Sequence, residues 1–139
     1  MQQFLVDTNV FVAAIKNPEK KAGAIDLILE LISNEEIYLV GNDLLLLELD
    51  KYAEKFKSKT TSHLIKRLKA KIVEVEVGEK YIKKCGEYFP KNNIVDIVHA
   101  ATCLQKNSIL ITNDKHFDKI SRNKIIEVWN ISMAIKNLL

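Results

Sequence analysis

FLVDTNVF, residues 4–11, is the stretch that decides the fold of this chain. Its first three residues, Phe4–Val6, are apolar, as expected for a strand that other elements cover on both faces. The strand ends on the carboxylate of Asp7, and the polar residues Thr8 and Asn9 then begin a helix. Asp, Thr and Asn all favour the start of a helix, so one interpretation is a strand end followed by a helix cap. The other interpretation is a strand that delivers an acidic side chain to a functional site at the edge of a sheet.

The length and composition indicate one globular domain over residues 1–139. Hydrophobic residues make up 47% of the chain, which is enough for a core and argues against disorder. The formal net charge of +3 indicates a mild preference for anionic partners such as nucleic acid or an acidic polypeptide. Cys85 and Cys103 fit neither a metal motif nor a disulfide framework, and we find no signal peptide and no apolar run that could span a membrane. We therefore expect a cytoplasmic protein with no membrane partner.

Predicted strands and helices alternate along the chain. The predicted strands are residues 3–6, 37–40, 72–77, 108–112 and 125–128. The predicted helices are residues 9–15, 23–33, 43–57, 62–70, 79–88, 94–106, 115–121 and 131–138. This alternation predicts an α/β fold with a mostly parallel five-stranded sheet and helices on both faces. The strand at 72–77, IVEVEV, alternates apolar and acidic residues, which places it at an edge of the sheet with one face in water.

Four acidic residues are predicted to meet at the carboxyl edge of this sheet. Asp7 follows the first strand and Asp114 follows the fourth. Asp96 opens the helix before the fourth strand, and Glu48 lies among leucines in the helix after the second. Neighbouring parallel strands lie about 5 Å apart, and ligands of such sheets bind beyond their carboxyl ends. Carboxylates gathered in this way repel one another and select a hard divalent cation, Mg²⁺ or Mn²⁺, which can activate water for phosphoryl displacement.

Each of these acids also has a purely structural explanation. Asp96 could complete a capping box with Asn93, and Asp114 could belong to an ordinary turn. Glu48 could be a partly exposed helix residue near Lys51. If all of these explanations held, four acids would lie at one edge of one sheet by coincidence, so we prefer a shared functional role.

The three histidines do not indicate a zinc site. His63 has the position of a surface helix residue. His99 lies one turn after Asp96, where it either packs in the interior, which is the commoner role, or touches the site. His116 lies two residues after Asp114.

Four motifs of the chain, in their order and spacing, resemble those of the PIN domain family. They are FLVDTNVF (4–11), LLLLEL (44–49), NIVDIVHAATC (93–103) and SILITNDKHFDKI (108–120). The resemblance extends over essentially the whole chain and is strongest to small single-domain toxins of the VapC type. It implies the strand order 3-2-1-4-5, in which the first strand lies beside the fourth and the third lies at an edge.

The resemblance also implies roles for individual residues. The implied catalytic residues are Asp7, Glu48, Asp96 and Asp114, of which Asp7, Asp96 and Asp114 are metal ligands. Asn9 and Thr112 are the implied supporting polar residues. The family often has a further aspartate where this chain has His116, so one or two bound metal ions, and contributions from His99 or Asp118, stay open.

The implied function is a Mg²⁺- or Mn²⁺-dependent endoribonuclease that acts on RNA, as the toxin of a toxin–antitoxin pair. Its implied partners are a cognate antitoxin and a second copy of the chain. We expect the apolar side chains of Leu27, Ile28, Leu31 and Ile32 to form an exposed helix surface suited to this homodimer.

Other functions are weighed against this one. Within the PIN family, they are an RNA-processing nuclease without an antitoxin and a degenerate domain that only binds RNA or protein. A phosphoaspartate enzyme of the haloacid-dehalogenase type also begins with a strand that ends in Asp, but it needs a second aspartate where this chain has Asn9. A response-regulator receiver domain needs a lysine at the end of its last strand, and IIEVWN (125–130) has none.

Overall fold

The computed structural model describes residues 2–16 and 23–139, so parts of the predicted domain 1–139, residues 1 and 17–22, lie outside the described residues. The strands are β1 (Gln2–Val6), β2 (Ile37–Gly41), β3 (Ile72–Glu74), β4 (Ile109–Ile111) and β5 (Val128–Trp129). They form one parallel sheet in the order β3-β2-β1-β4-β5. The predicted α/β fold, the strand order and the edge position of β3 are confirmed.

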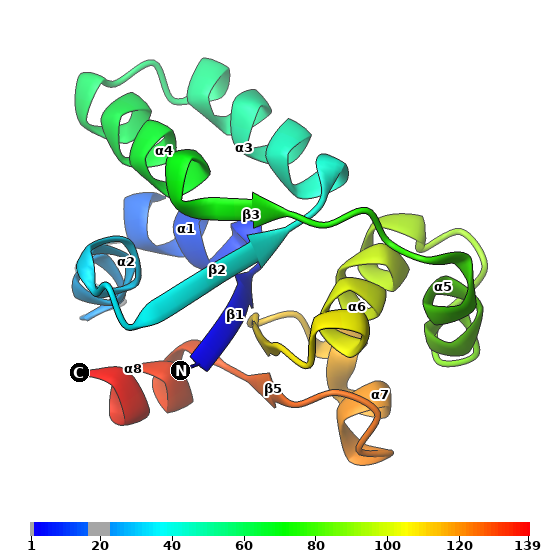
Figure 1. The fold of residues 1–139 in the computed structure, drawn as a ribbon. Coiled ribbons are helices and arrows are strands. Elements are labelled where there is room, and N and C mark those ends of the chain that lie inside the picture. Colours follow the sequence, from blue (N-terminus) through cyan, green and yellow to red (C-terminus); the bar gives the residue numbers. More distant parts are fainter. Residues whose placement is uncertain (1, 17–22) are drawn as a thin grey trace.

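Helices flank the sheet on both sides (Figure 1). They are α1 (Thr8–Lys16), α2 (Ala24–Ser33), α3 (Asp43–Lys55), α4 (Lys59–Lys71), α5 (Glu79–Gly86), α6 (Ile94–Lys106), the 3₁₀ turn η1 (Lys115–Phe117), α7 (Asp118–Arg122) and α8 (Ile131–Leu138). Helix α6 packs against β1, β2 and β4, whereas α1, α2 and α8 pack together on the other side. No helix in the described part of the chain has the length and apolarity needed to cross a membrane.

The pairing register of β1 and β4 brings the carboxyl ends of these two strands side by side at one edge of the sheet. Leu5 pairs with Leu110 and Val6 with Ile111. The backbone N–H of Asp7 then donates to the carbonyl oxygen of Ile111 at 3.0 Å. Because both strands run in the same direction, the residues that follow them leave the sheet side by side.

β3 is shorter than the predicted strand 72–77. Beyond Val75 the backbone no longer pairs with β2 and is hydrogen-bonded by a side chain of α6 instead. The N–H of Val75 still donates to the carbonyl of Gly41 at 2.8 Å. After that, the amide of Gln105 on α6 accepts from the N–H of Gly78 at 2.8 Å and donates to the carbonyl of Glu76 at 3.2 Å.

The last strand lies later in the chain than predicted. Residues 125–128 were expected to form it, and β5 occupies only Val128 and Trp129. Lys124 has a left-handed backbone with φ of 56°, and the N–H of Ile125 bonds back to the carbonyl of Ile120. This turn delays the return of the chain to the sheet.

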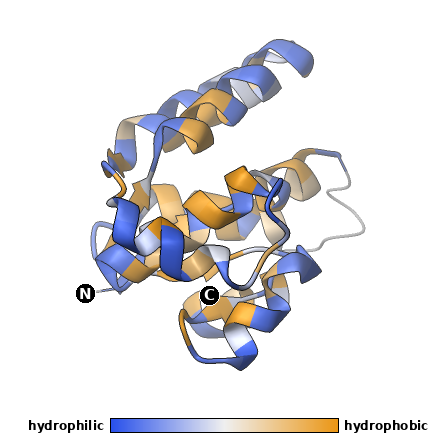
Figure 2. Cartoon of the chain, turned by 90° about the vertical axis from the view of Figure 1, so that its right-hand side faces the viewer, coloured by the Kyte–Doolittle hydropathy of each residue, from blue (hydrophilic) through white to orange (hydrophobic). Residues whose placement is uncertain are grey.

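The apolar side chains of α2 belong to the core of the chain. Figure 2 shows hydrophobic segments gathered toward the middle of the molecule, with hydrophilic helix faces outside. The residues expected on an exposed dimer surface are instead buried in that core; they are Leu27, Ile28, Leu31 and Ile32. That expectation was wrong, because the sequence shows an apolar helix face but not which element covers it. The homodimer itself stays a prediction.

Lys71 ties the end of α4 to the end of α2. Its ammonium donates to the carbonyl oxygens of Leu31 and Asn34, the latter at 2.8 Å. These carbonyls lie at the carboxyl end of α2, where a helix leaves backbone acceptors without partners and favours a positive charge. Burial lowers the pKa of Lys71, and the nearby carboxylate of Glu30 opposes this effect.

We predict that Lys71→Met lowers the free energy of unfolding by about 1.5–3 kcal/mol, because two charge-assisted hydrogen bonds are lost. Lys69→Met is the matched control, since Lys69 forms a solvent-exposed ion pair with Asp50. Losing that pair should cost less than about 1 kcal/mol. Urea denaturation of the three proteins measures both values, and equal losses would contradict the capping role of Lys71.

Candidate active site

A hydrogen-bonded network holds Asp7 where β1 and β4 end. The hydroxyl of Thr112 donates to Oδ2 of Asp7 at 2.9 Å, and Nδ2 of Asn9 contacts the same oxygen at 3.3 Å. The carboxyl group is almost fully buried. Thr112 and Asn9 therefore fix its orientation, and the hydroxyl of Thr8 lies near Oδ1 at 3.5 Å.

Thr112 also positions Asp114. Besides donating to Asp7, its hydroxyl oxygen accepts from Nδ2 of Asn9 at 3.1 Å and from the backbone N–H of Asp114 at 3.0 Å. One donor and two acceptor positions are all that a hydroxyl group offers. The single threonine thus joins the ends of both strands and the start of α1.

The donor atoms of Asp96, Asp114 and His116 lie within 4.8 Å of one another. Oδ1 of Asp114 accepts from the backbone N–H of His116 at 2.9 Å and thereby caps η1. Nδ1 of the same histidine lies 3.1 Å from Oδ2 of Asp96 and 3.3 Å from Oδ1 of Asp114. Within the described residues, the side chain of Asn93 makes no capping bond to α6. Asp96 is therefore turned toward the other acids rather than used in a capping box.

Glu48 reaches the same edge from α3. Its Oε2 accepts from the hydroxyl of Thr8 at 2.8 Å, and its Oε1 lies 3.5 Å from Nε2 of His99. Both Oε1 of Glu48 and Nε2 of His99 are buried, and neither has a hydrogen-bond partner among the described residues. The expectation of a packing role for His99 was incomplete, because the ring is buried and also faces the site.

Asn42 fixes the protonation of His99. The Oδ1 atom of Asn42 accepts from the N–H of Leu45 and caps α3, so its Nδ2 group must be the donor toward Nδ1 of His99 at 3.1 Å and Oγ1 of Thr102 at 3.0 Å. The hydroxyl of Thr102 in turn donates to the carbonyl of Val98 at 2.7 Å. Nδ1 of the ring is thus an acceptor, and the neutral ring carries its proton on Nε2, which faces Glu48.

The acids of the site have different pKa values. Burial raises the pKa of Asp7, although His99 and Thr112 oppose this effect; Glu48 and Asp96 raise it further. Burial also raises the pKa of Asp96, and the neighbouring Asp114 adds to the rise while the bond to His116 opposes it. The pKa of Glu48 is lowered by the facing His99 and by Thr8, against the effect of burial.

The donor set fits a divalent cation. Carboxylate oxygens converge from several elements, and one buried oxygen, Oε1 of Glu48, still lacks a partner among the described residues. Asp7 and Asp96 have raised pKa values, mainly because burial disfavours their charged forms and also because neighbouring carboxylates repel them. Asp7 lies beside the three-residue group rather than within it, and its role as a metal ligand stays a prediction.

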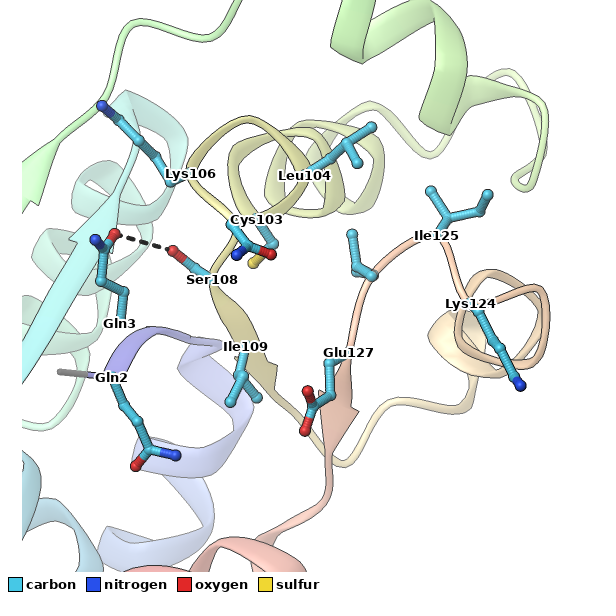
Figure 3. Close-up of a pocket in the computed structure, with 12 residues that line it drawn as sticks. Gln2, Gln3, Cys103, Leu104, Lys106, Ser108, Ile109, Lys124, Ile125 and Glu127 are labelled. Atoms are coloured by element: carbon cyan, nitrogen blue, oxygen red, sulfur yellow. Dashed lines mark hydrogen bonds between the residues drawn. The ribbon is translucent and has the colours of Figure 1, made fainter.

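A second hollow, of about 480 Å³, lies at the opposite edge of the sheet (Figure 3). Gln3 accepts a hydrogen bond from Ser108 at 3.4 Å along its wall, and Glu127 accepts one from Trp129 at 2.7 Å. Burial raises the pKa of Cys103, which also lines it, so a reactive thiolate is disfavoured there. Among the described residues, this hollow gathers no group of metal-ligating side chains.

Sequence reasoning missed the residues behind the acids. Asn42 lies outside the four motifs and Thr102 lies inside one without a predicted role, and only the folded structure shows the hydrogen bonds of Asn42 that link both residues to His99. Asp118 is exposed and lies outside the three-residue group, but it lines a hollow of about 350 Å³ together with Thr112 and Asp114. His63 is exposed on α4, as expected.

We predict that Asp7→Asn stabilises the metal-free protein at pH 7. The raised pKa means that the folded state disfavours ionised Asp7, so this destabilising effect grows as the pH rises through the folded pKa. The gain should disappear at a pH below the unfolded value near 3.8, where the wild-type group is protonated in both states. Urea denaturation at pH 7 and pH 3.5 measures it, with the exposed Asp26→Asn as control. A loss of stability at pH 7 would contradict the prediction.

The comparisons with known proteins agree with this fold. The family model described as PIN domain matches residues 4–123. No curated protein sequence matches the chain.

Among solved structures, VapBC-1 from nontypeable Haemophilus influenzae is similar at a TM-score of 0.62 and 23% identity, over 93% of this chain and 98% of that one. VapBC2 from Rickettsia felis, bound to a DNA fragment of its promoter, is similar at 0.59 and 18%, over 93% and 98%. FitAB bound to the IR36 DNA fragment is similar at 0.59 and 18%, over 91% and 94%. Identities this low establish the fold alone, but the family match spans most of the sequence, and the chain belongs to the PIN domain family.

Proposed function

We propose that this protein is a divalent-metal-dependent endoribonuclease and the toxin of a toxin–antitoxin pair. The observation that carries the proposal is the gathering of acids from four separate parts of the chain at one edge of the sheet. Family membership supports nuclease chemistry, since the site has carboxylates suited to a metal ion and lacks an activated nucleophile among its described residues.

In this proposal Asp7, Asp96 and Asp114 hold the cation. When bound, a divalent ion supplies an activated water and stabilises the charge that develops on the phosphate. Thr112 keeps two of these carboxylates in place through its hydrogen bonds. Glu48 is the acid that accepts a proton from the attacking water, and the facing Nε2 of His99, 3.5 Å from its Oε1, orients the carboxylate.

A groove beside Glu48 supports a single-stranded nucleic acid as substrate. A hollow of about 520 Å³ is lined by Glu48, Lys51, Tyr52, Lys55 and Val95. Lysines bind phosphates, and an aromatic ring stacks on any unpaired base. The groove thus combines both requirements directly next to an acidic residue of the site.

The aromatic surface continues along α3. Tyr52 stacks on Phe56 with ring centroids 5.7 Å apart, and the ammonium groups of Lys16 and Lys55 lie 5.7 and 5.9 Å from the Phe56 ring centre. A nucleic-acid strand bound along this surface contacts Lys16, Lys51 and Lys55 before its phosphates reach the acids. Positive charge at this place compensates the repulsion between phosphates and the carboxylates.

The toxin assignment is supported by the VapBC and FitAB structures that share this fold. We propose that a cognate antitoxin binds this chain and blocks its site, and that the chain forms a homodimer. Co-expression with the product of an adjacent small reading frame tests the first proposal, because a toxin is neutralised and co-purifies with its antitoxin. An RNA-processing nuclease would have no such partner.

We predict that Asp7→Asn and Asp96→Asn each reduce cleavage of a mixed RNA pool by several orders of magnitude in Mg²⁺ or Mn²⁺, while the proteins stay folded. If Asp96 were only a cap, its substitution would cost at most about 1 kcal/mol and leave cleavage intact. Asp26→Asn, on a helix that contributes no acid to the site, is the activity control. Cleavage that persists in both folded site variants would exclude this site as its source.

We predict that Tyr52→Ala and Lys55→Ala weaken RNA binding. The background is Asp96→Asn, which keeps the RNA intact. Loss of one base stack costs about 1–3 kcal/mol, so Kd for a labelled single-stranded RNA should rise about 5- to 150-fold in Tyr52→Ala. Tyr38→Ala, an exposed tyrosine on β2, is the matched control. Fluorescence anisotropy at two salt concentrations also separates the charge effect of Lys55. Unchanged affinity in both variants would place the RNA elsewhere.

A further inference from the structure

We propose that His116 is a metal ligand through Nδ1 and makes this site select Mn²⁺ or another first-row transition ion over Mg²⁺. The inference rests on the proposed function, because it concerns the ion of the same site. Nδ1 of His116 lies 3.1 Å from Oδ2 of Asp96 and 3.3 Å from Oδ1 of Asp114. All three donor atoms face one another.

The two separations from Nδ1 match edges of an octahedral metal site, and the donor atoms of Asp96 and Asp114 lie within 4.8 Å of each other. Ligand atoms at right angles around an ion, with bonds of about 2.1 Å, lie about 3.0 Å apart. The three donors need only small movements to close on an ion between them. They also come from two separate elements, α6 and the η1 turn, so the cluster is not a local feature of one loop.

The η1 turn holds the imidazole in this position. The carboxylate of Asp114 accepts from the backbone N–H of His116 at 2.9 Å. Phe117, the next residue, is fully buried and packs edge-to-face on Phe89 with centroids 5.5 Å apart. The histidine backbone is thus fixed on both sides, while its side chain is 62% exposed and Nε2 can hydrogen-bond to water.

The nitrogen donor changes which ion binds best. Mg²⁺ prefers oxygen ligands and keeps its water, whereas imidazole suits transition ions, whose affinity for a given site rises from Mn²⁺ along the series. Two carboxylates and one imidazole on a single face form a mixed site of this second kind. The competing role for His116 is an imidazolium that pairs with the two acids and is displaced when an ion binds.

Mn²⁺ binding to the full chain distinguishes these roles. Pulsed electron paramagnetic resonance of the Mn²⁺-loaded protein detects a directly bound ¹⁴N, and we expect this signal in wild type and in His63→Ala, but not in His116→Ala. By calorimetry, Kd for Mn²⁺ should rise by at least about tenfold in His116→Ala, with a smaller change for Mg²⁺. His116→Asp should shift the preference toward Mg²⁺, because it restores an all-oxygen set.

Three outcomes would overturn the inference. If wild type binds Mn²⁺ without a ¹⁴N signal, His116 is not a ligand, although the proposed nuclease site stands. A signal that survives in His116→Ala assigns the nitrogen to another residue, with His99 the nearest candidate. If wild type binds no ion, both this inference and the proposed metal-dependent function fail. Melting curves test whether each variant is folded. We expect the His116 variants to fold, because the His116 side chain is exposed.

Discussion

The hydrogen bond from Thr112 to Asp7 is the interaction on which the site depends. It joins the residue after β1 to the residue after β4, and it forms only because these strands are parallel neighbours in register. The same hydroxyl bonds the backbone of Asp114, so one side chain sets the spacing of two acids. The apolar strands matter to function through this bond, since any slip between β1 and β4 would separate Asp7 from Asp114.

The site is electrostatically unfavourable until something positive enters it. Burial raises the pKa of Asp7 and Asp96, which means that the fold holds these charges against their preference for water. Burying these two carboxylates lowers the free energy of unfolding. The hydrophobic core and the hydrogen bonds around Asn42 and Thr112 offset this loss. Glu48 differs from the two aspartates because the facing His99 and the hydroxyl of Thr8 lower its pKa against the effect of burial. Unequal acids within one cluster are what acid–base chemistry next to a metal ion requires.

The sequence predicted the topology of the sheet better than it predicted which elements surround each side chain, and the membership of the site stays a prediction. Strand order and the closeness of Asp96 to Asp114 follow from local patterns, because a strand end and a helix start are both visible in the residues themselves. The burial of the α2 face was not predictable. An apolar pattern such as that of Leu27 and Leu31 is the same whether a second copy of the chain or the chain's own helices cover it. The contact between His99 and Glu48 was likewise hidden, because it joins two helices that are far apart in the sequence.

Fold and metal preference are specified by different parts of this chain. Asp7 and Thr112 are bound to the strand ends, so a change there alters the register contacts as well as the site. His116 lies on a short turn that is held by the Asp114 cap and by buried Phe117, and among the described residues its own side chain makes no polar contact with the strands. Its side chain can therefore change without cost to the sheet, and each choice brings a different donor atom to the same two carboxylates. If His116 is a ligand as we propose, one substitution at this position alters the preferred ion, because the scaffold fixes where the donor atom lies and residue 116 decides whether that atom is nitrogen or oxygen.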